Sequence, residues 1–172
     1  MVGLERGTVE LEPYQEQWAE LYSREAERLR TITDGSFHEF EHIGSTAVEG
    51  MPAKPIIDIL AIVADLREVE LLISILEEHG YEYRPGDVEG RVFLAKGSRA
   101  NRTVYLSITE KGSDFHRKKI AFRDYLREHP EAAEQYALLK ERLAEKYPND
   151  RGKYTAEKTE FIQNILSRAM SE

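Results

Sequence analysis

The feature that most constrains the fold is a short apolar run from Ile56 to Val63, which a single acidic residue, Asp58, interrupts. Apolar residues stand at both odd and even positions of this run, so a strand built from it has two apolar faces. Such a strand needs cover above and below, and helices supply that cover in mixed folds. The sequence therefore predicts an inner strand of a sheet on which helices pack.

The segments on either side predict a small mixed sheet followed by helices. Alternating apolar residues predict short strands, and apolar residues at helical spacing predict helices. Strands that come first and helices that come last are typical of an α+β fold with a C-terminal helical layer. In chain order we expect strand 9–11, helix 18–32, strand 37–43, a loop over 44–55, strand 56–63, helix 65–79, strands 81–84, 91–95 and 103–108, and helices over about 113–128, 130–147 and 155–170.

The length of 172 residues indicates one globular domain over 1–172, with the sheet and its helices over about 1–110 and the helical layer over about 113–172. Cysteine is absent, which excludes thiolate metal sites and is typical of a reducing compartment. The first residues lack a signal-peptide pattern, and no apolar run is long enough to cross a bilayer. We therefore expect a cytoplasmic protein without a membrane partner.

The charge balance bears on the kind of ligand. Lysine and arginine number 24 against 32 aspartate and glutamate residues, which gives a net charge of −8. This balance disfavours binding to duplex nucleic acid, because neutralising the phosphates requires a cationic surface. A local basic site for a small anion is compatible with it.

The loop after strand 37–43 carries the residues best suited to chemistry. Gly44, Ser45 and Thr46 begin a helical turn, where backbone N–H groups and hydroxyls can hold a phosphate. Asp58 stands in the next strand, where a carboxylate needs hydrogen bonds, solvent or a cation such as Mg²⁺. The alternatives are a plain turn with Ser45 as its cap, and an Asp58 that accepts hydrogen bonds from loop N–H groups.

Helix 113–128 carries a cationic stripe. Lys119 and Arg123 stand four residues apart and share a helix face, a spacing suited to gripping an anion. A solvated face, or an ion pair between Arg123 and a core acid such as Glu25, explains the same residues.

Four further residues have a functional and a structural interpretation. Lys54 reaches a phosphate or covers the strand edge. Lys158 stands one helical turn after Tyr154, and it binds the same phosphate or forms a surface pair with Tyr154. His42 is better suited to a supporting hydrogen bond than to general base catalysis, because no serine–histidine–aspartate spacing surrounds it.

A set of residues spread along nearly the whole chain carries a family resemblance: His42–Thr46, Gly50, Lys54–Ile59, Ala121–Leu126, Tyr136, Lys140, Tyr154 and Lys158. With these residues the chain resembles the GrpB family, within the nucleotidyltransferase superfamily. The resemblance implies a nucleotidyltransferase-like fold in which Gly44 and Ser45 hold a nucleoside triphosphate and Asp58 ligates Mg²⁺. The family also occurs fused to dephospho-coenzyme A kinase, which implies a functional link to coenzyme A synthesis.

The chain departs from the superfamily pattern at its acidic positions. Leu60 stands where a second carboxylate is expected, and strand 103–108 offers no third one. Two hypotheses follow, a transferase that moves a nucleotidyl group to an unknown acceptor and a nucleotide-binding or regulatory module without catalysis. The predicted site consists of Asp58 as catalytic residue and metal ligand, Gly44, Ser45, Thr46, Lys54, Lys119, Arg123 and Lys158 around the phosphates, and His42 and Tyr154 in support.

Overall fold

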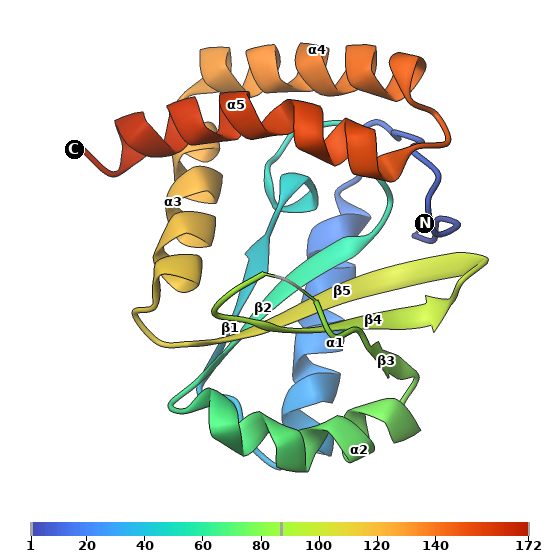
Figure 1. The fold of residues 1–172 in the computed structure, drawn as a ribbon, viewed down its shortest axis with the longest axis vertical. Coiled ribbons are helices and arrows are strands. Elements are labelled where there is room, and N and C mark those ends of the chain that lie inside the picture. The colour runs from blue at the N-terminus through green and yellow to red at the C-terminus, as the bar shows by residue number, and fades with distance from the viewer. Residues whose placement is uncertain (1, 87, 172) are drawn as a thin grey trace.

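The apolar run forms β2 (Ile57–Val63), an inner strand of a five-stranded sheet with the order β1-β2-β5-β4-β3 (Figure 1). β2 pairs antiparallel with β1 (Glu39–Ile43) and parallel with β5 (Asn101–Glu110). Antiparallel pairing continues through β4 (Val92–Ser98) to β3 (Tyr81–Tyr83). The sheet is therefore mixed, which confirms the predicted α+β class.

The computed structural model describes residues 2–86 and 88–171. Within these ranges, no helix is both long and apolar enough to cross a bilayer. The helices are α1 (Gln17–Ile32), α2 (Glu70–Glu78), α3 (Asp114–Glu128), α4 (Pro130–Lys146) and α5 (Arg151–Ala169), with single 3-10 turns η1 (Ser45–Ala47) and η2 (Leu66–Val69).

Different helices cover the two faces of β2. Ile59 and the other odd-numbered residues of the strand pack in one core cluster with Leu29 of α1. Leu60, on the opposite face, packs in a second cluster with Phe115 and Ile120 of α3. Both Ile59 and Leu60 are fully buried. The double cover that the sequence predicts is therefore confirmed.

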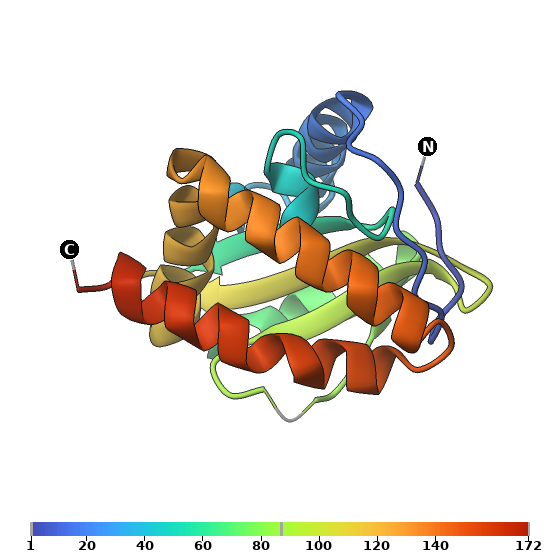
Figure 2. The same ribbon diagram turned by 90° about the horizontal axis from the view of Figure 1, so that it is seen from above.

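The C-terminal helices form a layer beside the sheet. α4 and α5 lie side by side across one end of it, and α1 lies on the side of the sheet away from α5 (Figures 1 and 2). Val48 and Met51, from the loop between β1 and β2, pack in one cluster with Tyr136 of α4 and Ile165 of α5. The loop that carries Gly44 and Ser45 therefore packs against this layer.

The predicted strand at 9–11 does not form. The Val9 amide donates to the Pro148 carbonyl instead of a neighbouring strand, and its side chain is buried against Leu143 and Tyr154. Two isolated bridges, Leu4 to Arg102 and Glu12 to Ala53, tie this segment to the sheet and the loop. Alternating apolar residues here reflect contact with the helical layer, so the strand prediction is wrong.

Several predicted boundaries shift by a few residues. β1 begins at Glu39 rather than at residue 37, and β4 and β5 extend to meet in a hairpin. The predicted helix 65–79 consists of the turn η2 and then α2. α5 begins at Arg151 because the Asp150 carboxylate accepts a hydrogen bond from the Lys153 amide and caps the helix.

Truncation of β2 on either face tests the double cover. Ile59→Ala and Leu60→Ala should each lower the free energy of unfolding by about 2–5 kcal/mol, because each leaves a cavity in a packed core. Leu71→Ala, at a residue 83% exposed, is the control and should change it by less than about 0.5 kcal/mol. Urea denaturation measures all three. A core variant as stable as the control would contradict the double cover.

Candidate functional site

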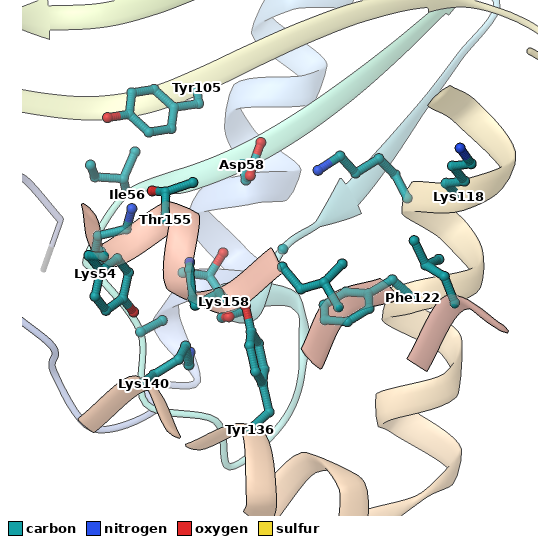
Figure 3. Close-up of a pocket in the computed structure, with 18 of the residues that line it drawn as sticks. Lys54, Ile56, Asp58, Tyr105, Lys118, Phe122, Tyr136, Lys140, Thr155 and Lys158 are labelled. Atoms are coloured by element: carbon teal, nitrogen blue, oxygen red, sulfur yellow. The ribbon is translucent and has the colours of Figure 1, made fainter. Parts of the chain in front are cut away.

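A pocket of about 360 Å³ lies between the start of β2, the loop before it and the helices α3, α4 and α5 (Figure 3). The fold brings most of the predicted site residues to this pocket, from segments far apart in the chain. Those that line it are Gly44, Ser45, Thr46, Lys54, Asp58, Lys119, Tyr154 and Lys158.

Gly44 brings the loop backbone against Asp58. Its φ angle is +73°, a conformation that favours glycine. A Cβ atom at Gly44 would lie 3.0 Å from Asp58 Oδ2 and 3.2 Å from Asp58 Cβ, so a side chain there would press on the carboxylate. Ser45 follows as the first residue of η1. The glycine therefore sets how closely the loop approaches the acidic side chain.

Asp58 is an acidic residue among cations. It is partly buried at the second position of β2, on the same face as Leu60. Loss of water raises the pKa of its carboxyl, while Lys119, Arg91 and Lys54 oppose this shift. The charges that surround this carboxylate are therefore lysine and arginine side chains.

Three helices each carry an aromatic residue four positions before a lysine, and in each pair the lysine ammonium lies over the aromatic ring. Such contacts hold a cation in place without a carboxylate. The distances from Nζ to the ring centroid are 5.3 Å for Lys119 over Phe115 in α3, 5.1 Å for Lys140 over Tyr136 in α4 and 4.4 Å for Lys158 over Tyr154 in α5.

Lys54, from the loop before β2, lies beside Lys158, with its ammonium 5.4 Å from the centroid of the Tyr154 ring that Lys158 also contacts. In the part of the chain that the structure describes, no carboxylate forms an ion pair with Lys54, Lys119 or Lys158. Loss of water, reinforced by neighbouring cations, lowers the pKa of Lys158 to about 7 and that of Lys54 to about 8. Their protonation therefore responds to any anion that enters.

Lys140 is the most deeply placed lysine of the pocket. Its side chain is 2% exposed, and its ammonium donates to the Pro52 carbonyl oxygen. Loss of water lowers its pKa well below the usual value, and Lys158 and Lys54 add to this shift. The bond to Pro52 fixes the end of the loop that leads into β2.

His42 supports the loop and lies outside the pocket lining. Its Nε2 is 2.9 Å from Thr46 Oγ1, and its ring stacks on Tyr22. Loss of water, with Arg127 nearby, lowers the pKa of His42 to about 4, so the ring is neutral at neutral pH. Arg127 also donates two hydrogen bonds to the Ala47 carbonyl oxygen. These contacts hold the turn that presents Ser45.

Arg123 does not face the pocket, which corrects its predicted place among the phosphate ligands. Its guanidinium donates to the Glu41 carboxylate at 2.6 Å and to the His42 carbonyl oxygen at 3.1 Å. The alternative partner, Glu25, instead pairs with Lys96 on β4. Arg123 is a structural cation because Glu41, on the adjoining strand, neutralises it.

The donor set does not fit a Mg²⁺ cage of carboxylates. Leu60 occupies the second acidic position, and the β5 residues paired with Asp58 and Leu60 are Tyr105 and Ser107. The Ser107 hydroxyl accepts a hydrogen bond from Arg91. Among the described residues, no three His, Cys, Asp or Glu side chains are grouped to hold a metal. Mg²⁺ prefers several oxygen ligands, and the described lining of the pocket offers one carboxylate, that of Asp58.

Several pocket residues were not assigned to the site from the sequence. Tyr136 and Lys140 contributed only to the family resemblance, and Tyr105, Phe115 and Lys118 were not assigned. The repeated spacing of an aromatic residue and a lysine four positions later, on three successive helices, is the signal that identifies most of them.

A family model described as GrpB protein matches residues 8–168. The glutamate-rich protein GrpB of Alkalihalophilus pseudofirmus is 38% identical over 172 residues, which cover 97% of this chain and 99% of the relative. The UPF0157 protein YqkA of Bacillus subtilis is 36% identical over 94% of this chain, and the match spans 47% of that longer protein.

A solved structure gives the same family assignment, and a more distant one shows the fold. The crystal structure of the conserved protein GrpB from Enterococcus faecalis has a TM-score of 0.88 and 38% identity, over 94% of this chain and 98% of that one. The Cid1 poly(U) polymerase bound to MgATP has a TM-score of 0.55 and 12% identity, over 77% of this chain and 44% of that one. The second likeness shows a nucleotidyltransferase-like fold and no more. The chain belongs to the GrpB family.

Proposed function

We propose that this protein binds a phosphate-bearing small molecule, in the first place a nucleoside triphosphate, in the pocket between Gly44–Ser45 and the lysine cluster. The cluster consists of Lys54, Lys119, Lys140 and Lys158. The observation that carries the proposal is that Lys54, Lys119 and Lys158 face the pocket and form no ion pair with a carboxylate of the described chain. Lys54 and Lys158 are half-buried, and half-buried cations without an ion-pair partner are costly, so a multivalent anion relieves that cost.

The lining of the pocket supports a ligand that combines phosphates with a flat apolar group. Lysine side chains lie on both sides of the pocket, with Lys54 on one side and Lys118 on the same side as Phe122 (Figure 3). Phe122, Tyr105 and Ile162 line the same pocket. Ammonium groups bind phosphate oxygens, and aromatic and aliphatic side chains bind a base or another flat group. A nucleotide combines both kinds of group.

Two forms of the function remain distinct, nucleotidyl transfer to an unknown acceptor and binding without catalysis. Leu60 favours the second form, because it is fully buried beneath Phe115 and Ile120 of α3. An aspartate at that position would be buried away from solvent. The link to coenzyme A synthesis stays a prediction, and dephospho-coenzyme A belongs among the ligands to be tested.

The proposed binding of a phosphate-bearing ligand does not itself require Mg²⁺. A nucleoside triphosphate in its Mg²⁺ complex has phosphate oxygens and waters as metal ligands. If that complex were the form bound, Asp58, the acidic side chain that lines the pocket in the described residues, would be the protein's ligand to the metal.

Removal of one pocket lysine tests the proposal. A panel of nucleoside triphosphates and dephospho-coenzyme A should contain a ligand that raises the melting temperature. A ligand at 100 times its Kd adds about 2.7 kcal/mol of stability. Lys158→Met should weaken that ligand at least tenfold, which is about 1.4 kcal/mol, because it removes a cation while keeping the stem.

Lys153→Met is the matched control, since Lys153 lies on the same helix, is exposed and does not line the pocket. It should change the affinity less than about twofold, the size of a minor surface effect. Equal losses of affinity in Lys158→Met and Lys153→Met would show that the net charge of α5, and not the pocket, determines binding, so the site would be wrongly assigned.

The pH dependence of binding is a second test. Lys158 and Lys54 have lowered pKa values of about 7 and about 8, so they lose their protons as the pH rises from 7 to 9. The affinity for a nucleoside triphosphate should therefore fall over this range, by up to about tenfold per pH unit for each proton required. Isothermal titration calorimetry measures it. Lys158→Met should flatten the profile, and a wild-type profile that is already flat would contradict the assignment.

A further inference from the structure

We propose that lysine ammonium groups take the place of the metal ion in this pocket, so that the phosphate-bearing ligand binds as the free anion without a divalent cation. This inference rests on the proposed function, since it concerns the form in which the same ligand binds. It differs from the prediction that Asp58 serves as a Mg²⁺ ligand.

The charges that line the pocket are the reverse of those in a metal-dependent site. In such a site, several carboxylates hold the metal, and the metal in turn holds the phosphates. Here, Asp58 is the acidic side chain among the described lining residues. The basic residues that line the same pocket are Lys54, Lys118, Lys119, Lys140 and Lys158.

The surroundings of Asp58 disfavour a divalent cation. Gly44 holds the loop against the carboxylate, so one side of it faces backbone. Lys119, Arg91 and Lys54 are the charges that act most strongly on the carboxylate. A metal ion at Asp58 would be repelled by all three, whereas a phosphate in front of them would be attracted. Asp58 therefore limits repulsion within the lysine cluster.

The place of a second metal-binding carboxylate is filled by the core. Leu60, two residues after Asp58 on the same face of β2, is fully buried against Phe115 and Ile120. Phe115 also carries the Lys119 ammonium over its ring. Helix α3 thus covers Leu60, where a second acidic residue is missing, and supplies the Lys119 cation that acts on Asp58, the acidic residue that is present.

Aromatic rings keep the cations in place before any ligand binds. Lys158 and Lys54 share the ring of Tyr154, and Lys140 lies over the ring of Tyr136. The quadrupole of each ring stabilises the ammonium group but adds no net negative charge. Asp58 balances one charge among the described lining residues, and the ligand must balance the others, which favours a di- or triphosphate over a monovalent anion.

Binding in the presence and absence of Mg²⁺ tests this inference. The probes are ATP and inorganic pyrophosphate, titrated calorimetrically into the full chain in EDTA and in excess Mg²⁺. We expect binding in EDTA at least as tight as in Mg²⁺, because Mg²⁺ neutralises the phosphate charges that the lysines bind. Lys119→Met should weaken binding in EDTA at least tenfold.

Asp58→Asn separates the two roles of the carboxylate, and it keeps the volume of the side chain. We expect it to tighten binding in EDTA about threefold or more, because it removes a negative charge beside the phosphates. Its thermal unfolding and far-ultraviolet circular dichroism confirm that it folds. Binding that requires Mg²⁺ and is lost in Asp58→Asn would overturn this inference and leave the proposed function standing. No binding of either probe under any condition would overturn both.

Discussion

The fold around the pocket is constrained by a cluster of lysines that form no ion pair with a carboxylate in the described part of the chain. Lys54 and Lys158 share one ring, Tyr154, and Lys54 adds to the loss of water that lowers the pKa of Lys158. Mutual repulsion and loss of water oppose folding, so the surrounding packing must hold these side chains in place. Binding sites commonly contain such unfavourable charge arrangements, because a bound ligand of opposite charge stabilises them. The cluster is thus the feature that best connects fold with function.

The supporting structure fixes the loop that faces the cluster. Arg123 bridges α3 to Glu41 on β1, and Arg127 holds the Ala47 carbonyl oxygen. His42 stays neutral and bonds to Thr46, the residue that follows Ser45. These polar contacts are made at the edge of the pocket, so the loop is positioned before a ligand arrives. Preorganised donors of this kind lose little freedom on binding.

The sequence predicts much of the fold because its strongest pattern is local. Apolar residues on both faces of 56–63 require double cover, and the structure provides it with α1 and α3. The prediction of a strand at 9–11 was wrong because Val9 is apolar for contact with Leu143 of α4, and not because the segment pairs in a sheet. Arg123 was misplaced because its partner, Glu41, lies on a strand that only the folded chain brings near. The spacing of cations along a helix does not predict which of them forms an ion pair with a carboxylate from another part of the fold.

The ionisation of Lys158 tests the central claim most directly. Nuclear magnetic resonance of isotope-labelled lysine side chains, with Lys158 assigned by its Met variant, follows its pKa with and without inorganic pyrophosphate in EDTA. The account predicts a pKa of about 7 in the free protein, and a rise of about one unit or more when pyrophosphate binds. A Lys158 that titrates near 10.5 and does not respond to pyrophosphate would contradict it.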